Sequence, residues 1–279
     1  MVGLLGNDSG KTSVATSLVR EARSKGVRAL GVKPVGGHSA WGQYDTLVRS
    51  LRYGMLVGED AYRLWLASDK AEPIEAISPL DVLTVPPDPE HARSFEEYLV
   101  LSENLADVAV MLRVTRLEED RLTTSHYLAE ENLERAVPSL KDSIRELAGL
   151  VKAETVTGEE LLGLVAGAAE HTDSILRRML QKYELVVVES FNNAALPTPL
   201  CLEADWVVLV APGRAYVYRG DRYSRAVESI VSIRGPNITT LEVSKYVKPV
   251  GTVALLPRGK GDLDSAGSDT RELLDLLES

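Results

Sequence analysis

The sequence predicts an α/β protein built on a doubly wound, mainly parallel sheet. Apolar runs of strand length alternate along the chain with longer segments whose apolar residues repeat with helical period. Several runs are apolar almost throughout, which is typical of strands covered by helices on both faces. The first run leads directly into a glycine-bearing loop and a helix, the order in which this fold class opens.

That opening carries a phosphate-binding motif. Val2 to Leu5 predicts a buried strand, a polar loop follows, and Gly10-Lys-Thr12 leads into a helix. In such a loop the amides and the lysine bind phosphate oxygens, and the threonine hydroxyl binds Mg²⁺. The usual first glycine is displaced by one place, to Gly6, so a loop that contains Gly-Lys-Thr without binding phosphate is the alternative. The strand before it and the helix after it favour a nucleotide site of the P-loop NTPase type. The predicted nucleotide-binding residues here are Gly6, Asn7, Asp8, Ser9, Gly10, Lys11, Thr12 and Ser13.

The next elements repeat the pattern. Residues 12–25 predict a helix with Gly26 as its C-cap, and residues 27–35 predict a second strand rich in β-branched residues. Lys33 ends that strand, where its ammonium group can neutralise phosphate charge; a solvated lysine at a sheet edge is the alternative.

A loop and a helix are expected after Lys33. Residues 36–45 are dense in glycine and polar residues and predict a loop, and residues 54–71 predict a helix. Asp45 and Asp60 are candidate Mg²⁺-site acids, with surface charge as the alternative for each. His38 is the histidine worth testing, because its loop is expected over the site.

Residues 90–183 predict a largely helical insertion within a single domain spanning residues 1–279. The proline-rich segment at residues 85–89, which disfavours helix and strand, precedes it. Apolar residues alternate over 107–114 and predict one strand inside it. Thr157-Gly-Glu-Glu160 fits a capping box that opens a helix to about Lys182. A connection of this length exceeds ordinary α/β loops, so it is interpreted as a substrate lid or a dimer surface.

The strand signal then returns at 183–189, 204–210 and 250–256, followed by a short helix at 269–277. Glu189 ends the first of these strands, and an acid there can bind Mg²⁺ through water or orient a nucleophile. A strand-terminal acid facing solvent is the alternative. Pro257 and Arg258 follow the last strand, where such folds often bind the nucleotide base.

The amino-acid composition narrows the classes of protein to which this chain can belong. The chain has 279 residues, 44% hydrophobic and 26% charged residues, and a net charge of −10, so nucleic acid is an unlikely partner. No apolar run approaches the length of a membrane span, and no basic, apolar leader precedes the first strand. Cys201 is the sole cysteine, so an intrachain disulfide is impossible. We therefore expect a cytoplasmic protein that does not bind or span a membrane.

Four segments together resemble dethiobiotin synthetase: Gly6-Asn-Asp-Ser-Gly-Lys-Thr12, Gly31-Val-Lys-Pro-Val35, Gly58-Glu-Asp-Ala61 and Val188-Glu-Ser-Phe-Asn-Asn193. The resemblance implies phosphate contacts from Lys11, Thr12 and Lys33, and Mg²⁺ contacts from Asp60 and Glu189. The chain also resembles uncharacterised archaeal proteins described as predicted P-loop ATPases or GTPases. Its loop is two residues shorter than in dethiobiotin synthetase, so the resemblance carries nucleotide binding rather than the biotin-pathway substrate.

Three functions fit these residues. The first is an enzyme that uses ATP and Mg²⁺ to phosphorylate or activate an unknown small-molecule acceptor, with Lys11, Lys33 and Glu189 as catalytic residues and Thr12, Asp60 and Glu189 at the metal. The second is a nucleotide-hydrolysing switch acting through a homodimer or a protein partner. The third is a scaffold that only retains a nucleotide. ATP is favoured over GTP because no Asn-Lys-x-Asp signature of guanine recognition occurs.

Overall fold

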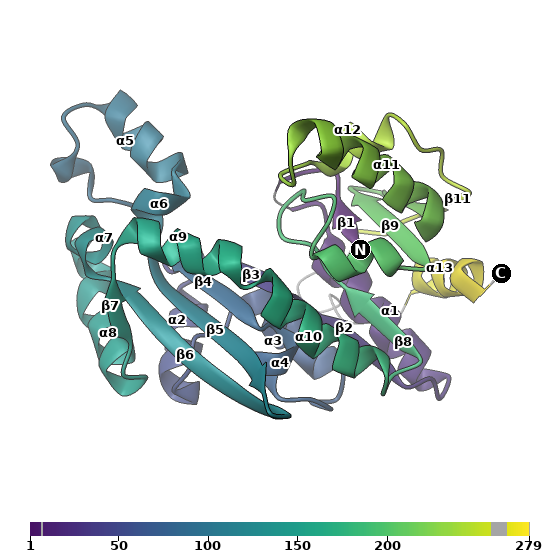
Figure 1. The fold of residues 1–279 in the computed structure, drawn as a ribbon, viewed down its shortest axis with the longest axis horizontal. Helices are drawn as coiled ribbons and strands as arrows, with labels where there is room; N and C mark the ends of the chain where they lie inside the picture. Colours follow the sequence, from purple (N-terminus) through teal and green to yellow (C-terminus); the bar gives the residue numbers. More distant parts are fainter. Residues whose placement is uncertain (7, 258–266, 279) are drawn as a thin grey trace. The chain divides into compact units, whose positions relative to one another are not determined.

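The structure is a computed structural model that describes residues 1–6, 8–257 and 267–278 (Figure 1). The chain divides into two compact units: unit 1 comprises Met1–Pro34, Arg63–Pro73 and Leu176–Ser279, and unit 2 comprises Val35–Tyr62 and Ile74–Ile175. A single domain with an insertion at 90–183 stays a prediction. Unit 2 draws on more of the chain than that insertion.

Unit 1 contains two short sheets that backbone hydrogen bonds join. Its strands are β1 (Val2–Gly3), β2 (Ala29–Val32), β8 (Leu185–Val188), β9 (Trp206–Ala211), β10 (Arg214–Arg219) and β11 (Gly251–Ala254). Strand β1 pairs with β9 and β2 pairs with β8, both in parallel. The Met1 nitrogen donates to Val188 O (2.9 Å), and Ser190 N–H donates to Met1 O (2.9 Å). These two bonds flank Glu189 in the pattern of a parallel pair, so β1 lies between β8 and β9.

Helices cover both faces of these strands. They are α1 (Lys11–Ser24), α11 (Gly220–Arg234), α12 (Thr240–Ser244) and α13 (Ser268–Glu278), with a 3₁₀ turn at Pro199–Glu203. Successive residues of β9 point to opposite faces, and Val207 and Leu209 pack with Tyr223 and Val227 of α11. Helices α1 and α13 contact one another, and α1 also contacts β2, β8 and β9. Strands covered on both sides confirm the α/β class.

Unit 2 has a five-stranded mixed sheet of its own, ordered β3-β4-β5-β6-β7. The strands are β3 (Val35–Ser39), β4 (Leu80–Thr84), β5 (Ala109–Glu118), β6 (Arg121–Ala129) and β7 (Glu154–Val156). Its helices are α2 (Tyr44–Tyr53), α4 (Ile74–Ile77), α5 (Phe95–Glu103), α6 (Leu105–Val108), α7 (Glu130–Arg135), α8 (Pro138–Leu150) and α9 (Gly158–Gly167), with a 3₁₀ turn at Pro89–His91. Helices α3 (Glu59–Ala67) and α10 (Ala169–Leu180) contain the boundaries between the units.

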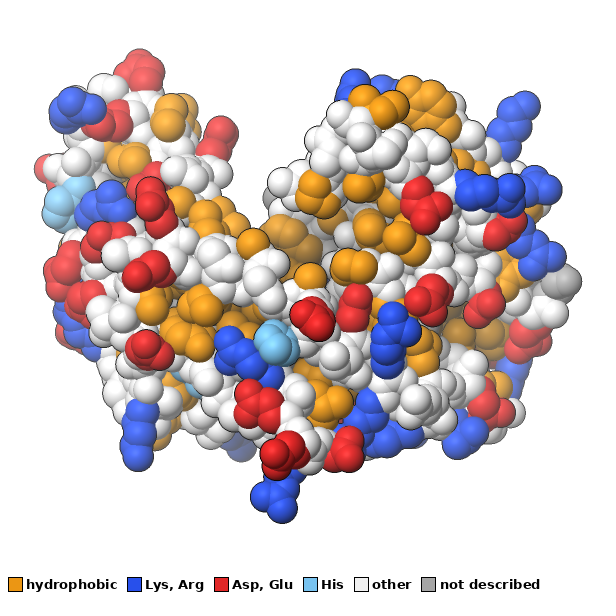
Figure 2. Space-filling model, in the orientation of Figure 1, with side chains coloured by type: hydrophobic (Ala, Val, Ile, Leu, Met, Phe, Trp, Pro, Cys, Tyr) orange, Lys and Arg blue, Asp and Glu red, His pale blue; other side chains and the backbone are white. Residues whose placement is uncertain are grey.

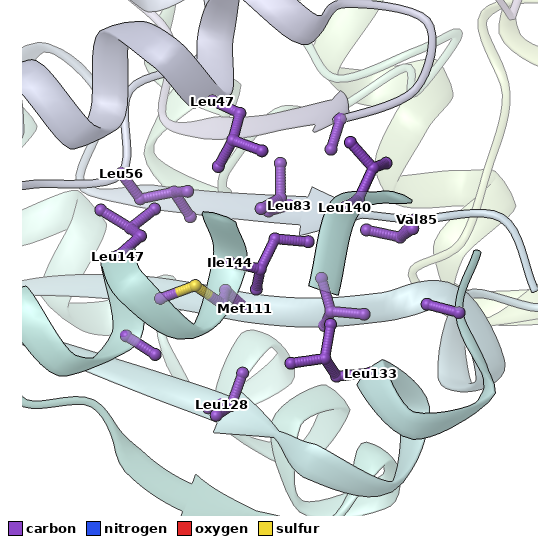
Figure 3. Packing of buried hydrophobic residues seen from close by; sticks show 14 residues of the cluster. Leu47, Leu56, Leu83, Val85, Met111, Leu128, Leu133, Leu140, Ile144 and Leu147 are labelled. Atoms are coloured by element: carbon purple, nitrogen blue, oxygen red, sulfur yellow. The ribbon is translucent and has the colours of Figure 1, made fainter. Parts of the chain in front are cut away.

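The sheet of unit 2 is held between two apolar clusters. Leu83, Met111 and Leu128 face α2, α7 and α8, and the cluster they form there is shown in Figure 3. The alternate residues, among them Leu112 and Tyr127, pack with Leu161 of α9, which crosses β5 and β6 (Figure 1). The helical content predicted for 90–183 is present, and the capping box at Thr157 is confirmed. The helix that it opens ends at Gly167, before α10.

Two expectations were wrong in detail. The sequence predicted one strand at 107–114, but residues 109–129 form a hairpin whose turn residues, Glu119 and Asp120, both have positive φ (46° and 65°). Such turns usually contain glycine or asparagine, so this turn gave no signal. The predicted loop at 36–45 instead begins with strand β3 and leads into α2. Parallel pairs occur in each sheet, and antiparallel pairs accompany them where two-residue turns join β5 to β6 and β9 to β10.

Candidate active site in unit 1

Two residues of the loop between β1 and α1 have left-handed backbone conformations. Gly10 is the N-cap of α1 and has φ +85°, a conformation that glycine adopts without strain, and Asp8 also has positive φ (55°). The first turn of α1 contains no acidic residue, so its positive end is not neutralised from within the helix. The predicted contact of Asn7 lies outside the described residues.

Lys11 turns back over strand β1 rather than into solvent. Its side chain is buried, and Nζ donates to Ser9 Oγ (3.3 Å), which itself donates to Leu5 O (3.2 Å). This path depends on Gly3, because a Cβ there would lie 2.7 Å from Lys11 Nζ and 2.4 Å from Ser9 Oγ. Sequence reasoning missed Gly3, and its signal is a glycine inside an otherwise apolar strand.

Glu189, Thr12 and Lys33 meet at one carboxylate oxygen. The Thr12 hydroxyl donates to Glu189 Oε1 (2.7 Å), and Lys33 Nζ donates to the same oxygen (2.9 Å). Lys33 also donates to Ser190 O (3.1 Å). The residues come together because Thr12 opens α1 after β1, while Lys33 and Glu189 follow the parallel neighbours β2 and β8.

Burial removes the charged groups of this cluster from water, so each needs a partner of opposite charge. Lys33 is 3% exposed and Glu189 1% exposed, so neither charge is solvated. Each ion depends on the other, and removing one partner of such a pair typically costs about 3–5 kcal/mol. Solvated charge, the alternative for both residues, is therefore excluded by their burial.

Sequence reasoning also missed Arg63 on α3, whose Nη2 donates to Ser13 Oγ (3.3 Å) in the first turn of α1. It adds a third cationic side chain close to the loop in unit 1. Pro257 is exposed after β11, and Arg258 lies outside the described residues. Their contact with a base stays a prediction.

The remaining candidates belong to unit 2. Asp60 lies in the first turn of α3 and Asp45 in the first turn of α2. Their roles at a metal stay predictions. Across the described residues, no group of three or more His, Cys, Asp or Glu side chains could hold a metal ion by itself.

His38 is not on a loop but is buried on β3, in a polar row within unit 2. Asp81, Arg113 and His126 lie directly opposite one another on β4, β5 and β6, and His38 Nε2 is 3.7 Å from Asp81 Oδ1. Arg113 donates to Leu56 O (2.8 Å), and Gly58 N–H donates to Asp81 Oδ2 (2.7 Å). The row fastens the segment between α2 and α3 to the sheet.

Burial controls the protonation of these histidines. It lowers the pKa of His38, an effect that Asp81 partly offsets, and it lowers the pKa of His126 to about 4, with Arg113 contributing in the same direction. The Thr46 hydroxyl donates to Gln43 O (2.7 Å), so it accepts from His38 Nδ1 at 2.6 Å. His38 is therefore a neutral, structurally engaged residue.

Comparison with known proteins supports a P-loop ATPase relationship. The ATP-dependent dethiobiotin synthetase BioD of Anaeromyxobacter dehalogenans (strain 2CP-1 / ATCC BAA-258) is 43% identical to this chain over 72 residues. That match covers 25% of this chain and 25% of the relative, so the chain spans about a quarter of the relative's length. No protein-family model and no solved structure matches. Resemblance to the archaeal group stays a prediction.

Within the described part of the chain, no helix combines the length and the apolar character needed to cross a membrane.

Proposed function

We propose that this chain is a Mg²⁺-dependent P-loop enzyme that uses ATP to phosphorylate or activate a small molecule. The observation that carries the proposal is the convergence of Thr12, Lys33 and Glu189 on one buried oxygen beside the glycine-bearing loop. The segment shared with an ATP-dependent dethiobiotin synthetase supports the same chemistry.

Phosphate binding is assigned to the loop and to Lys11. Loop amides and the open first turn of α1 present partial positive charge to phosphate oxygens. Lys11 is held over Gly3 by Ser9, so its ammonium group is positioned before a nucleotide arrives. Such preorganisation spares the ordering of a long side chain on binding.

Thr12 and Glu189 are the residues that would hold Mg²⁺. Their oxygens lie 2.7 Å apart, and hydroxyl and carboxylate oxygens are the hard donors that this ion prefers. The ion, when bound, would neutralise negative charge on the phosphates. Asp60 is the third predicted ligand.

Lys33 is proposed to stabilise charge during transfer. In the reaction, an acceptor oxygen or nitrogen forms a bond to the γ-phosphorus of ATP, the bond to the bridging oxygen breaks, and ADP leaves. Negative charge then develops on the oxygens around the phosphorus, where a fixed ammonium group is most effective. Lys33 is held within 2.9–3.1 Å of two oxygens, so its direction is set by the protein.

The first test is nucleotide binding by Lys11→Ala, measured by calorimetry with Mg²⁺-ATP and Mg²⁺-GTP. We expect binding to be abolished while the fold is retained. Lys25→Ala is the matched control, because Lys25 follows the other end of the same helix and pairs on the surface with Asp275. Unchanged affinity in Lys11→Ala would remove this loop from nucleotide binding.

The second test separates an enzyme from a switch. Specific ligands raise the apparent melting temperature by mass action, so small carboxylic acids and amines are screened by thermal shift with Mg²⁺-ATP present. For an enzyme, a hit should increase ADP formation and become phosphorylated. ADP formation that no small molecule stimulates, together with nucleotide-dependent self-association, would favour the switch.

A further inference from the structure

One face of α11 and the segment after α12 form a groove that no function above uses. The groove has a volume of about 940 Å³, and its α11 side consists of residues spaced as one helical stripe: Arg222, Arg225, Ala226, Ser229, Ile230 and Ile233. Tyr246, Val247 and Lys248 form the opposite side. The groove lies entirely within unit 1.

The groove combines exposed apolar side chains with positive charge. Ile233 is 83% exposed and Tyr246 is 74% exposed, which is unusual for side chains of this size. Its three charged lining residues are all cations, in a chain whose net charge is −10. Arg225 pairs with Asp221 on its own helix, whereas Arg222 and Lys248 form no ion pair with any described residue. Figure 2 shows orange and blue side chains together over α11 and α12.

Helix α5 of unit 2 has the complementary character. None of its residues is buried, and it projects beyond α6 at the edge of unit 2 (Figure 1). Phe95 is 80% exposed, Leu99 59% and Val100 68%. At 100° per residue, Glu96 and Glu103 fall between these apolar side chains on the helix surface. Glu97 is engaged by Arg93, but Glu96 and Glu103 form no ion pair with a described residue.

We propose that α5 of one copy of this chain docks into the α11 groove of a second copy. Phe95, Leu99 and Val100 would cover Ile230, Ile233 and Tyr246, while Glu96 and Glu103 would meet Arg222 and Lys248. The lengths agree, since the nine residues of α5 extend about 13 Å and the stripe from Arg222 to Ile233 rises about 16 Å. This is the helix-in-groove mode of recognition, with apolar anchors and charged flanks. It does not depend on the proposed enzymatic function.

The test is sedimentation velocity of the full chain over a wide range of concentration. The wild-type chain should self-associate, and Phe95→Lys and Ile233→Glu should each raise the dissociation constant at least about tenfold, because one buried aromatic or aliphatic anchor is typically worth more than about 1.4 kcal/mol. Both side chains are on the surface, so folding is retained. Leu150→Glu is the control. Leu150 is an exposed apolar residue (56%) outside α5 and the groove, so its substitution should leave association unchanged.

Mixing the two variants gives the sharper result. Phe95→Lys keeps an intact groove and Ile233→Glu keeps an intact α5, so an equimolar mixture should associate more tightly than either variant alone. Charge reversal at Arg222→Glu should weaken association, and adding Glu96→Arg should restore it. A monomeric wild-type chain, association that survives either single variant, or a mixture that stays monomeric would overturn the proposal.

Discussion

At the level of single residues, Glu189 organises the candidate site, since its Oε1 receives hydrogen bonds from both Thr12 and Lys33. Glu189→Gln keeps the shape and removes the charge that would hold a metal. We expect turnover to fall by about 10²-fold or more, the scale of losing one electrostatic contact in phosphoryl transfer. The turnover of the variant and of the wild type is measured as steady-state ADP formation.

Glu184→Gln is the matched control for Glu189. Glu184 precedes the other end of β8 and pairs at the surface with Arg28, so its turnover should equal that of the wild type. Wild-type turnover in Glu189→Gln would show that the carboxylate serves only to pair with Lys33.

Lys33→Met removes the positive charge of Lys33 while keeping most of the length of the side chain. Nucleotide affinity should fall only a few-fold, whereas transfer should slow by about 10²-fold or more if Lys33 stabilises developing charge. The variant also leaves Glu189 buried without its ammonium partner, which costs about 3–5 kcal/mol of stability. Adding Glu189→Gln should recover most of the melting temperature without recovering activity. Recovered turnover in the double variant would contradict a catalytic role for the pair.

At the level of elements, the polar row of unit 2 ties three strands to the segment before α3. Arg113 is fully buried, lies 3.8 Å from Asp81 and donates to Leu56 O. Arg113→Met should lower the free energy of unfolding by about 3–5 kcal/mol, because Asp81 would remain as an uncompensated charge. Adding Asp81→Asn should recover a large part of that loss.

Urea denaturation measures both changes, and Arg121→Met on the neighbouring strand is the control, expected within about 0.5 kcal/mol of the wild type. Equal losses in Arg113→Met and the double variant would mean that packing, rather than charge, holds the row together.

His126 on β6, in the same polar row, should make the free energy of unfolding depend on pH. Its pKa is about 4 in the folded state against 6.5 when unperturbed, so the unfolded state binds the proton first as pH falls. The free energy of unfolding should therefore decrease between pH 6.5 and 4, with up to about 3 kcal/mol from this residue. His126→Gln keeps an acceptor for the Leu56 N–H and should flatten the decrease.

Urea denaturation at a series of pH values tests this, with His91→Gln as the control at an exposed histidine. An unchanged slope in His126→Gln would assign the acid sensitivity to other groups.

At the level of the whole molecule, each unit has its own sheet and its own apolar clusters. The cluster of Lys11, Thr12, Lys33 and Glu189 lies within unit 1, and the buried polar row lies within unit 2. The match to dethiobiotin synthetase covers a quarter of the chain, whereas the two units together comprise all of it. An ATP-dependent activity is therefore proposed from the site and is not carried over from the relative.

The sequence was sufficient for the elements that local chemistry specifies. Gly10-Lys-Thr12 predicted the start of α1, Thr157 predicted a capping box, and the apolar run before Glu189 predicted β8. Lys33 and Glu189 could be named because strand ends converge in a parallel sheet, whatever the exact pairing. These signals depend on neighbours within a few residues, so they are visible in the chain itself.

Only the tertiary structure decided which distant residues meet. Glu189 Oε1 receives Thr12 and Lys33 from elements more than 150 residues away, and Gly3 matters only because Lys11 folds back over it. A loop was predicted at residues 36–45 because the segment is rich in glycine, which is common in turns. Gly36 is instead in a strand, where a Cβ would lie 2.8 Å from Asp81 Oδ1. Close approach and burial are properties of packing between distant segments, and the order of residues along the chain does not encode them locally.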